Sequence, residues 1–101
     1  MSKPSAELID LGNELMIYQV AKVKAEIERC LSAQSTATPA LKLDCARLNE
    51  IDAAGLQLLM VTARYLQLNR GRLQLLRVSH AMQLQLQRWD ALNEIDVDCV
   101  N

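Results

Sequence analysis

Apolar and polar residues alternate along several short segments of the chain, a two-residue period that is typical of β-strands. The clearest case is LKLDCA, residues 41–46, where leucines and a cysteine occupy one face and a lysine and an aspartate the other. Residues 14–17 form a second predicted strand, after a Gly-Asn turn. Residues 72–78 are apolar on both faces, so this strand is expected to be more deeply buried. Residues 1–11 alternate weakly and are expected to add an edge strand.

Two longer segments change to a period near 3.6 residues, which predicts amphipathic helices. The first helix begins at Tyr18, and its apolar stripe comprises Val20, Val23, Ile27, Cys30 and Leu31. The second ends near Asn69, where Gly71 is well placed to terminate it. Its apolar stripe comprises Leu56, Leu59, Met60, Ala63 and Leu66. Residues 32–39 between the first helix and the next strand are small and polar, and they predict a loop.

The segment HAMQLQLQRW fits two periods. Met82, Leu84 and Leu86 alternate with glutamines, as in a strand, whereas Met82, Leu86 and Trp89 are spaced as on one face of a helix. Ser79 is a suitable N-cap, and leucine and glutamine favour helix over strand. We therefore predict a third helix here.

The predicted order of strand and helix, repeated three times, indicates an α/β fold with right-handed crossovers and a small, mostly parallel sheet. The amphipathic strand at residues 41–46 indicates that the helices cover mainly one face of that sheet. The length of 101 residues predicts a single domain spanning residues 1–101.

Composition and charge narrow the class of partner. The formal net charge is -1 and the pI is about 5.7, which argues against nucleic-acid binding and against binding to anionic membranes. No run approaches the roughly 18 apolar residues of a membrane span, so we expect no membrane insertion. Residues 1–11 lack the apolar stretch of a signal peptide. The three cysteines are widely spaced, which fits reduced thiols in the cytoplasm.

Few residues are suited to catalysis. His80 is the only histidine, and Cys45 is the cysteine that could pair with it as nucleophile and base. Nothing in the sequence brings the two together, so a surface histidine and a buried cysteine are the simpler interpretation. The cysteine and histidine spacing predicts no metal site, and three scattered glycines predict no phosphate-binding loop and no cofactor.

The junction NEIDAAGLQLLM places very small residues where a strand passes into a helix. Asp52 has two interpretations: it caps the second helix, or it forms with the small residues after it a flat patch that another protein's backbone can approach closely. The residues that could border such a patch are Gln83, Gln85 and Gln87.

Three stretches together resemble the STAS domain, whose best-known members are anti-sigma factor antagonists. They are GNELMIYQVAKVKAEIERCL, LKLDCARLNEIDAAGLQLLM and GRLQLLRVSHAMQLQLQRW, and they cover nearly the whole chain. The most specific element is a strand, a short loop, the motif I-D-x-x-G-L at residues 51–56, and a helix.

This resemblance implies a non-enzymatic component of partner-switching signalling in bacterial transcription regulation. In such proteins an anti-sigma factor that is also a serine kinase-like ATPase binds the motif loop and phosphorylates a Ser or Thr before the glycine. The matching loop here comprises Asp52, Ala53, Ala54, Gly55 and Leu56. Alanines occupy both acceptor positions, so the loop keeps the binding shape but lacks the phosphoacceptor.

The alanines leave several functions open. The domain could bind its partner constitutively, or its regulation could lie at Ser79, Thr36 or Thr38. STAS domains also occur as small subunits of lipid-transport ATPase complexes and as chemotaxis-associated regulators, and a homodimerisation unit is a further alternative. An enzyme that uses Cys45 or His80 is the alternative of a different class.

Overall fold

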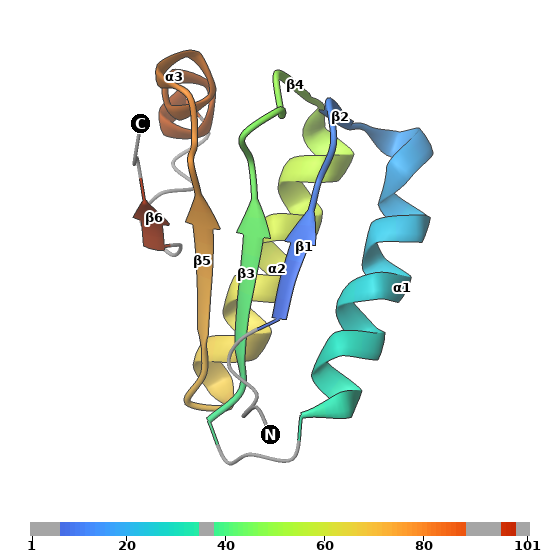
Figure 1. Cartoon of the computed structure of the whole chain (residues 1–101). Helices are drawn as coiled ribbons and strands as arrows, with labels where there is room; N and C mark the ends of the chain where they lie inside the picture. Colours follow the sequence, from blue (N-terminus) through green and yellow to red (C-terminus); the bar gives the residue numbers. More distant parts are fainter. Residues whose placement is uncertain (1–6, 35–37, 89–95, 99–101) are drawn as a thin grey trace.

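The computed structural model describes residues 7–34, 38–88 and 96–98 (Figure 1). Its main sheet has four strands in the order β1-β3-β5-β6, and each neighbouring pair is parallel. These strands are β1 (Glu7–Asp10), β3 (Ala40–Asp44), β5 (Arg72–Leu76) and β6 (Asp96–Asp98). A second, two-stranded parallel sheet joins β2 (Glu14–Leu15) to β4 (Glu50–Ile51). The predicted α/β class and mostly parallel sheet are therefore confirmed.

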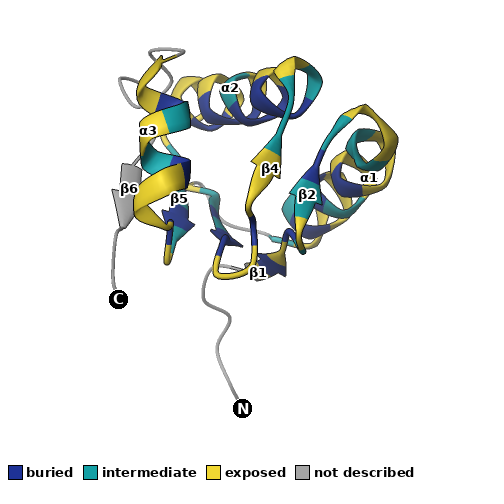
Figure 2. Cartoon of the chain, turned by 90° about the horizontal axis from the view of Figure 1, so that it is seen from above, coloured by how far each residue is buried: buried dark blue, intermediate teal, exposed yellow. Residues whose placement is uncertain are grey.

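Three helices connect these strands in the residues that the structure describes. α1 (Ile17–Ala33) and α2 (Ala53–Leu68) lie side by side on one face of the main sheet (Figure 2). α3 (His80–Arg88) follows β5 at the carboxyl edge of the sheet, which is the upper edge in Figure 1. The prediction that helices cover mainly one face is confirmed, and the segment with two possible periods is a helix.

The core lies between the main sheet and the two long helices, and it is built chiefly from leucine. Alternate residues of β3 and β5 point into it, because successive side chains of a strand face opposite sides. The most fully buried side chains are Leu15, Leu41, Leu43, Cys45, Leu59, Leu66, Leu75, Met82 and Leu86. The predicted stripes of both long helices are therefore core stripes, with Val20, Leu31 and Met60 only partly buried.

Several predicted boundaries are wrong by a few residues. The strand predicted at residues 14–17 stops at Leu15, because the backbone of Ile17 already belongs to α1. The strand predicted at residues 41–46 ends at Asp44. Two strands were not predicted, because β4 has two residues and β6 three, too few to show alternation. The predicted edge strand is confirmed as β1 in the described part of the chain.

The end of α2 differs from the prediction in the residue that adopts the left-handed conformation. Arg70, not Gly71, adopts the left-handed conformation, with φ 61°. The Gly71 amide donates to the Leu66 carbonyl at 2.6 Å and the Arg70 amide donates to the Gln67 carbonyl at 3.1 Å, which is the Schellman pattern. Gly71 is needed for a different reason: a Cβ there would lie 2.2 Å from the carbonyl oxygen of Pro39.

A second arginine in the left-handed region ends β5. Arg77 has φ 57°, so the strand predicted at residues 72–78 stops at Leu76. The side chains of Gln74 and Leu76 are only half-buried, so the second face of β5 is less buried than its sequence suggests.

Candidate functional site

The turn between β4 and α2 is built around Asp52. Its backbone is extended, with φ -109° and ψ -176°, and its Oδ1 accepts a hydrogen bond from the Gly55 amide at 3.0 Å. Its carbonyl accepts the first helical hydrogen bond, from the Leu56 amide at 2.9 Å. This geometry is that of an N-cap residue, so the capping interpretation of Asp52 is confirmed.

The other carboxylate oxygen of Asp52 caps a different helix. Oδ2 accepts a hydrogen bond from the Ile17 amide, the first helical residue of α1, at 2.9 Å. The N-cap of α1 is Met16, whose side chain is not of the type that caps helices. The Gln19 side chain accepts from the Met16 amide at 3.0 Å. A single carboxylate therefore ties together the N-termini of the two long helices.

Hydrogen bonds keep this carboxylate ionised. The backbone amides of Gly55 and then Ile17 hold the pKa of Asp52 below its usual value of 3.8, because they stabilise the charged form. Burial acts in the opposite direction and is the smaller effect. Asp52 is thus a fixed negative charge near neutral pH and is unsuited to exchanging protons there.

The glycine of the motif is required by packing. Gly55 is buried against β2, and a Cβ at this position would lie 2.0 Å from the carbonyl oxygen of Leu15. Any larger residue must therefore push the start of α2 away from β2. Bulk at Gly55 would be directed into the fold and not towards a docking protein. Gly55→Leu is therefore expected to disturb the fold itself, and not only the binding of a partner.

The structure divides the five motif residues into two groups. Ala53 is exposed, and Ala54 and Asp52 are half-buried, so these three are accessible to another molecule. Gly55 and Leu56 are buried and act as core residues. Any contact with a partner at this turn is therefore made by the first three residues.

An apolar surface on α2 continues from this turn. Val61, Tyr65 and Leu68 are 61%, 52% and 78% exposed, although side chains of this kind are usually buried. They border a shallow hollow of about 560 Å³, and Figure 2 shows exposed residues along the side of α2 that faces away from the sheet. We call this surface the α2 face; its residues are Gln57, Met60, Val61, Arg64, Tyr65 and Leu68.

The α2 face and the Asp52 turn are parts of one surface. Ala53, Gln57 and Val61 are spaced by four residues, so they lie one above the other on the helix. On the opposite side of Asp52, Ile17 and Tyr18 at the start of α1 are 59% and 86% exposed. The sequence signal that was missed is the i, i+4, i+7 spacing of residues 61, 65 and 68, a second apolar stripe beside the core stripe.

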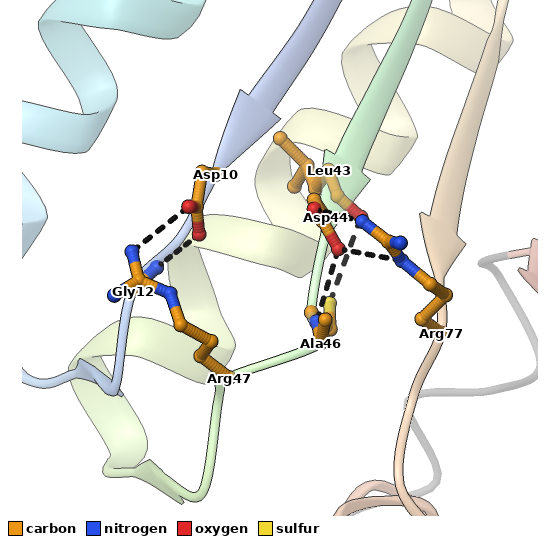
Figure 3. Close-up of polar contacts among 8 residues, drawn as sticks. Asp10, Gly12, Leu43, Asp44, Ala46, Arg47 and Arg77 are labelled. Carbon is orange, nitrogen blue, oxygen red and sulfur yellow. Dashed lines mark hydrogen bonds and ion pairs between the residues drawn. The ribbon is translucent and has the colours of Figure 1, made fainter. Parts of the chain in front are cut away.

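Two ion pairs cross the carboxyl edge of the main sheet (Figure 3). Asp10 and Asp44 lie directly opposite each other on β1 and β3. Arg47 Nη2 donates to Asp10 Oδ2 at 2.8 Å, and the guanidinium of Arg77 donates to both oxygens of Asp44. Gly12 donates its amide to Asp10 Oδ1 at 2.9 Å. Each of two adjacent carboxylates is thus neutralised by its own arginine.

These pairs lower the pKa of both carboxyl groups. The hydrogen bond from Arg77 is the main cause for Asp44, whereas for Asp10 the Gly12 amide comes first and Arg47 second. Asp44 is only 9% exposed, although the alternation of residues 41–46 places it with Lys42 on the polar face of its strand. Its burial is tolerated because Arg77 and the Ala46 amide both donate to it.

In the described part of the chain, no hydrogen bond links Cys45 and His80, the two candidate catalytic residues. Cys45 is fully buried, and burial raises the pKa of its thiol to about 12. Its Sγ donates a hydrogen bond to the carbonyl oxygen of Leu43 at 3.7 Å. His80 is exposed at the start of α3. Among the described residues, no three of the His, Cys, Asp and Glu side chains gather as metal ligands would.

A profile of the family described as "Mlab, STAS domain" matches residues 2–95. The chain belongs to the STAS domain family. No protein of curated function matches this STAS domain by sequence.

Solved structures show the same fold at low sequence identity. A sulfate transporter family protein from Wolinella succinogenes is 19% identical, with a TM-score of 0.77; the match covers 93% of this chain and 76% of that one. The anti-sigma factor antagonist SpoIIAA in its unphosphorylated form is 22% identical, with a TM-score of 0.72, over 100% of this chain and 86% of that one. At these identities the likeness establishes the STAS fold.

The substitute phosphoacceptors proposed for this STAS domain lie in different settings. Ser79 is exposed and caps α3, because its Oγ accepts a hydrogen bond from the Met82 amide at 3.1 Å. Thr38 is exposed before β3, while Thr36 lies outside the described residues, as does Trp89. The side chains of Gln83 and Gln85 are half-buried and that of Gln87 is exposed.

None of the helices in the described ranges is both long and apolar enough to cross a membrane.

Proposed function

We propose that this STAS domain is a non-enzymatic protein-interaction module, a single domain over residues 1–101 that acts in the cytoplasm. Its partner is a kinase-like ATPase of the anti-sigma factor type or a related signalling protein. The partner contacts Asp52, Ala53 and Ala54 and then continues along the α2 face. Both the family and the SpoIIAA-like fold support this proposal, because they are typical of interaction modules.

The exposed apolar residues of the α2 face carry the proposal. A contiguous apolar surface rimmed by polar residues marks a site of interaction with another macromolecule. Here the polar rim includes Gln57 and Arg64, and Val61, Tyr65 and Leu68 form the centre. Tyrosine and arginine are over-represented among residues that dominate binding energy. The rigid turn at Asp52 fixes the end of this surface.

The alanines favour a lasting complex over a phosphorylation switch at this turn. Neither Ala53 nor Ala54 can accept a phosphate, so phosphate cannot weaken the contact there. This observation also favours the second candidate function, a small STAS subunit of a lipid-transport ATPase complex or a chemotaxis-associated regulator. Both candidates use the same surface and differ in the ATPase or signalling protein that they bind.

The enzyme alternative finds little support. A thiolate is the reactive form of cysteine, and a thiol with a pKa of about 12 is almost entirely protonated near neutral pH. Cys45 is also closed off from solvent by the core. Alkylation of Cys45 in the folded protein should be far slower than alkylation of a free thiol. A faster reaction would support a role for Cys45 as a catalytic nucleophile.

A pair of matched variants tests the proposal. Leu68→Asp places a charge on the α2 face, and Leu84→Asp makes the same change on α3, where Leu84 is 51% exposed. Tagged wild type and both variants are used to capture proteins from the native cell, and the captured protein is identified by mass spectrometry. We expect an ATPase with wild type and Leu84→Asp but not with Leu68→Asp, and an affinity reduced about tenfold or more in titration.

Two results would contradict this function. Equal capture by all three proteins would remove the α2 face from the interface. A concentration-dependent dimer in sedimentation that Leu68→Asp disrupts, with no captured ATPase, would make this surface a homodimer contact.

A further inference from the structure

A second hollow lies at the opposite edge of the sheet from the Asp52 turn. It has a volume of about 580 Å³ and opens where α2 ends and where β3 and β5 begin, at the lower edge of Figure 1. This volume is within the range of small-molecule sites, roughly 300–1,000 Å³. Its polar lining residues are Thr38, Gln67, Arg70 and Arg72, and its accessible apolar wall includes Pro39 and Ala40. Two arginines therefore face one cavity in a protein whose net charge is -1.

The left-handed backbone conformation of Arg70 is strained for an arginine, which indicates that the arginine side chain has a role at this position. Arg70 and Arg77 both have positive φ, a conformation that glycine adopts without strain and most residues avoid. The guanidinium of Arg77 binds Asp44. In the described part of the chain no residue pairs with the guanidinium of Arg70, and Arg70 is an exposed residue that lines the hollow.

Helix capping does not account for this arginine. Basic residues near a helix C-terminus often bond the last carbonyl groups. At the end of α2, however, the Leu66 and Gln67 carbonyls already accept the Gly71 and Arg70 amides, and the Tyr65 carbonyl accepts the Asn69 side chain at 2.8 Å. A glycine at residue 70 would make the same backbone bonds without strain.

We infer that the hollow binds a small organic oxyanion, a phosphate or carboxylate attached to an apolar group. The guanidinium of Arg70 contacts the oxyanion with Arg72 beside it, since arginine matches planar and tetrahedral oxyanions with paired donors. The apolar part of the ligand lies against Pro39 and Ala40, which are half-buried. This site is separate from the α2 face and does not depend on the function proposed for that surface.

The test uses phenyl phosphate and inorganic phosphate as probes on the full chain, followed by amide chemical shifts in NMR spectra. We expect phenyl phosphate to shift the amides of Gly71, Arg72 and Ala40 with a dissociation constant of about 1 mM or below, and inorganic phosphate to bind more weakly. Arg70→Gln should reduce the affinity for phenyl phosphate about tenfold. Arg29→Gln, at an exposed position on α1, is the matched control and should bind as wild type does.

Vesicles of phosphatidylglycerol, compared with phosphatidylcholine, test whether the oxyanion belongs to a lipid headgroup. Sedimentation with phosphatidylglycerol that Arg70→Gln abolishes would also support the site and would assign it to a headgroup. Failure to bind both phenyl phosphate and these vesicles would overturn the inference, and so would binding that Arg70→Gln leaves unchanged. Equal affinity for the two soluble probes would overturn the role of the apolar wall.

Discussion

The carboxylate of Asp52 lies 2.9 Å from the amide nitrogen of Ile17, a residue 35 positions earlier in the chain. The same side chain caps its own helix through the Gly55 amide. The motif aspartate therefore fixes the N-termini of α1 and α2 relative to each other, and with them the exposed residues that flank the turn. Its structural role and its role in a binding surface are compatible, because the first creates the geometry that the second needs.

Substitutions of Asp52 should separate these two caps. Asp52→Asn keeps one acceptor oxygen, whereas Asp52→Ala removes both. We expect the Ile17 amide to exchange its proton about fivefold faster, or more, in Asp52→Ala, with the Gly55 amide affected as well. In Asp52→Asn only one of the two amides should lose protection. Hydrogen exchange followed by NMR measures both, and unchanged exchange at Ile17 in Asp52→Ala would contradict the link between the helices.

Gly55→Ala should destabilise the fold, although alanine normally stabilises a helix relative to glycine. The Cβ would clash with the backbone of Leu15, so we expect the free energy of unfolding to fall by about 2–4 kcal/mol. Urea denaturation measures the loss. Gly12→Ala is the control, because Gly12 has φ 75° but no atom within 4 Å of an added Cβ. Gly12→Ala should lower the free energy of unfolding by about 1 kcal/mol, from backbone strain alone. A Gly55→Ala protein as stable as wild type would contradict the close contact between Gly55 and Leu15.

Arg70 and Arg77 both have positive φ, but replacing each of them by glycine should change the stability of the fold in opposite directions. Arg70→Gly relieves backbone strain and breaks no ion pair with a described residue, so the free energy of unfolding should rise by about 0.5–1 kcal/mol. Arg77→Gly relieves the same strain but leaves the buried Asp44 carboxylate without its guanidinium, so the urea midpoint should fall. Arg70→Gly should also lose phenyl phosphate binding. A less stable Arg70→Gly protein would show that this arginine supports the fold.

Acid should weaken the fold partly through Asp44. Arg77 lowers the pKa of this carboxyl group in the folded state below its usual value of 3.8. The stabilisation is therefore fully present above the unfolded pKa and is lost as pH falls through the lower, folded pKa. We expect the urea midpoint of wild type to fall steeply below about pH 4, and that of Asp44→Asn to start lower but fall less. Parallel profiles for the two proteins would exclude a contribution from this pair.

Restoring a hydroxyl tests whether the turn descends from a phosphorylation switch. If the captured partner is an active kinase, Ala53→Ser and Ala54→Ser should each gain a phosphate, detected by intact mass. Ala53→Ser should be the better substrate, because Ala53 is exposed and Ala54 is half-buried. A phosphate at this helix N-terminus is favourable for the fold, so its effect should fall on the complex. Phosphate on wild-type Ser79 would show that regulation has moved to α3.

The sequence predicted well the features that depend on nearby residues. The order of the long elements follows from their periods, and the caps at Asp52 and Ser79 follow from residue type and position. Features that depend on distant residues were missed. Neither the bond to Ile17 nor the contact of Gly55 with Leu15 has a local signal, except that Met16 is an unusual N-cap and so suggests a cap from elsewhere.

The predictions for the end of α2, the burial of Asp44 and the exposed stripe of α2 were incomplete for separate physical reasons. Gly71 follows α2 closely enough to end it, but a glycine is needed there because the Pro39 carbonyl leaves no room for a Cβ. The left-handed residue that ends the helix is Arg70. The burial of Asp44 depends on Arg77, which follows the carboxyl end of the neighbouring strand β5. No pattern in the sequence relates these two residues, which are 33 positions apart. Composition could not separate the exposed stripe of α2 from its core stripe, because both are made of the same residue types.

The parallel sheet has a consequence for how the chain reaches its native state. Every strand pairing described is parallel, so no neighbouring strands can meet through a tight hairpin. A long helix lies between β1 and β3 in the sequence, and another between β3 and β5. The two ends of each of these connecting segments must come together before the strands can form their hydrogen bonds, which costs chain entropy. Such non-local pairing slows folding, and we expect refolding on a timescale of roughly milliseconds to seconds, with the helices forming ahead of the sheet.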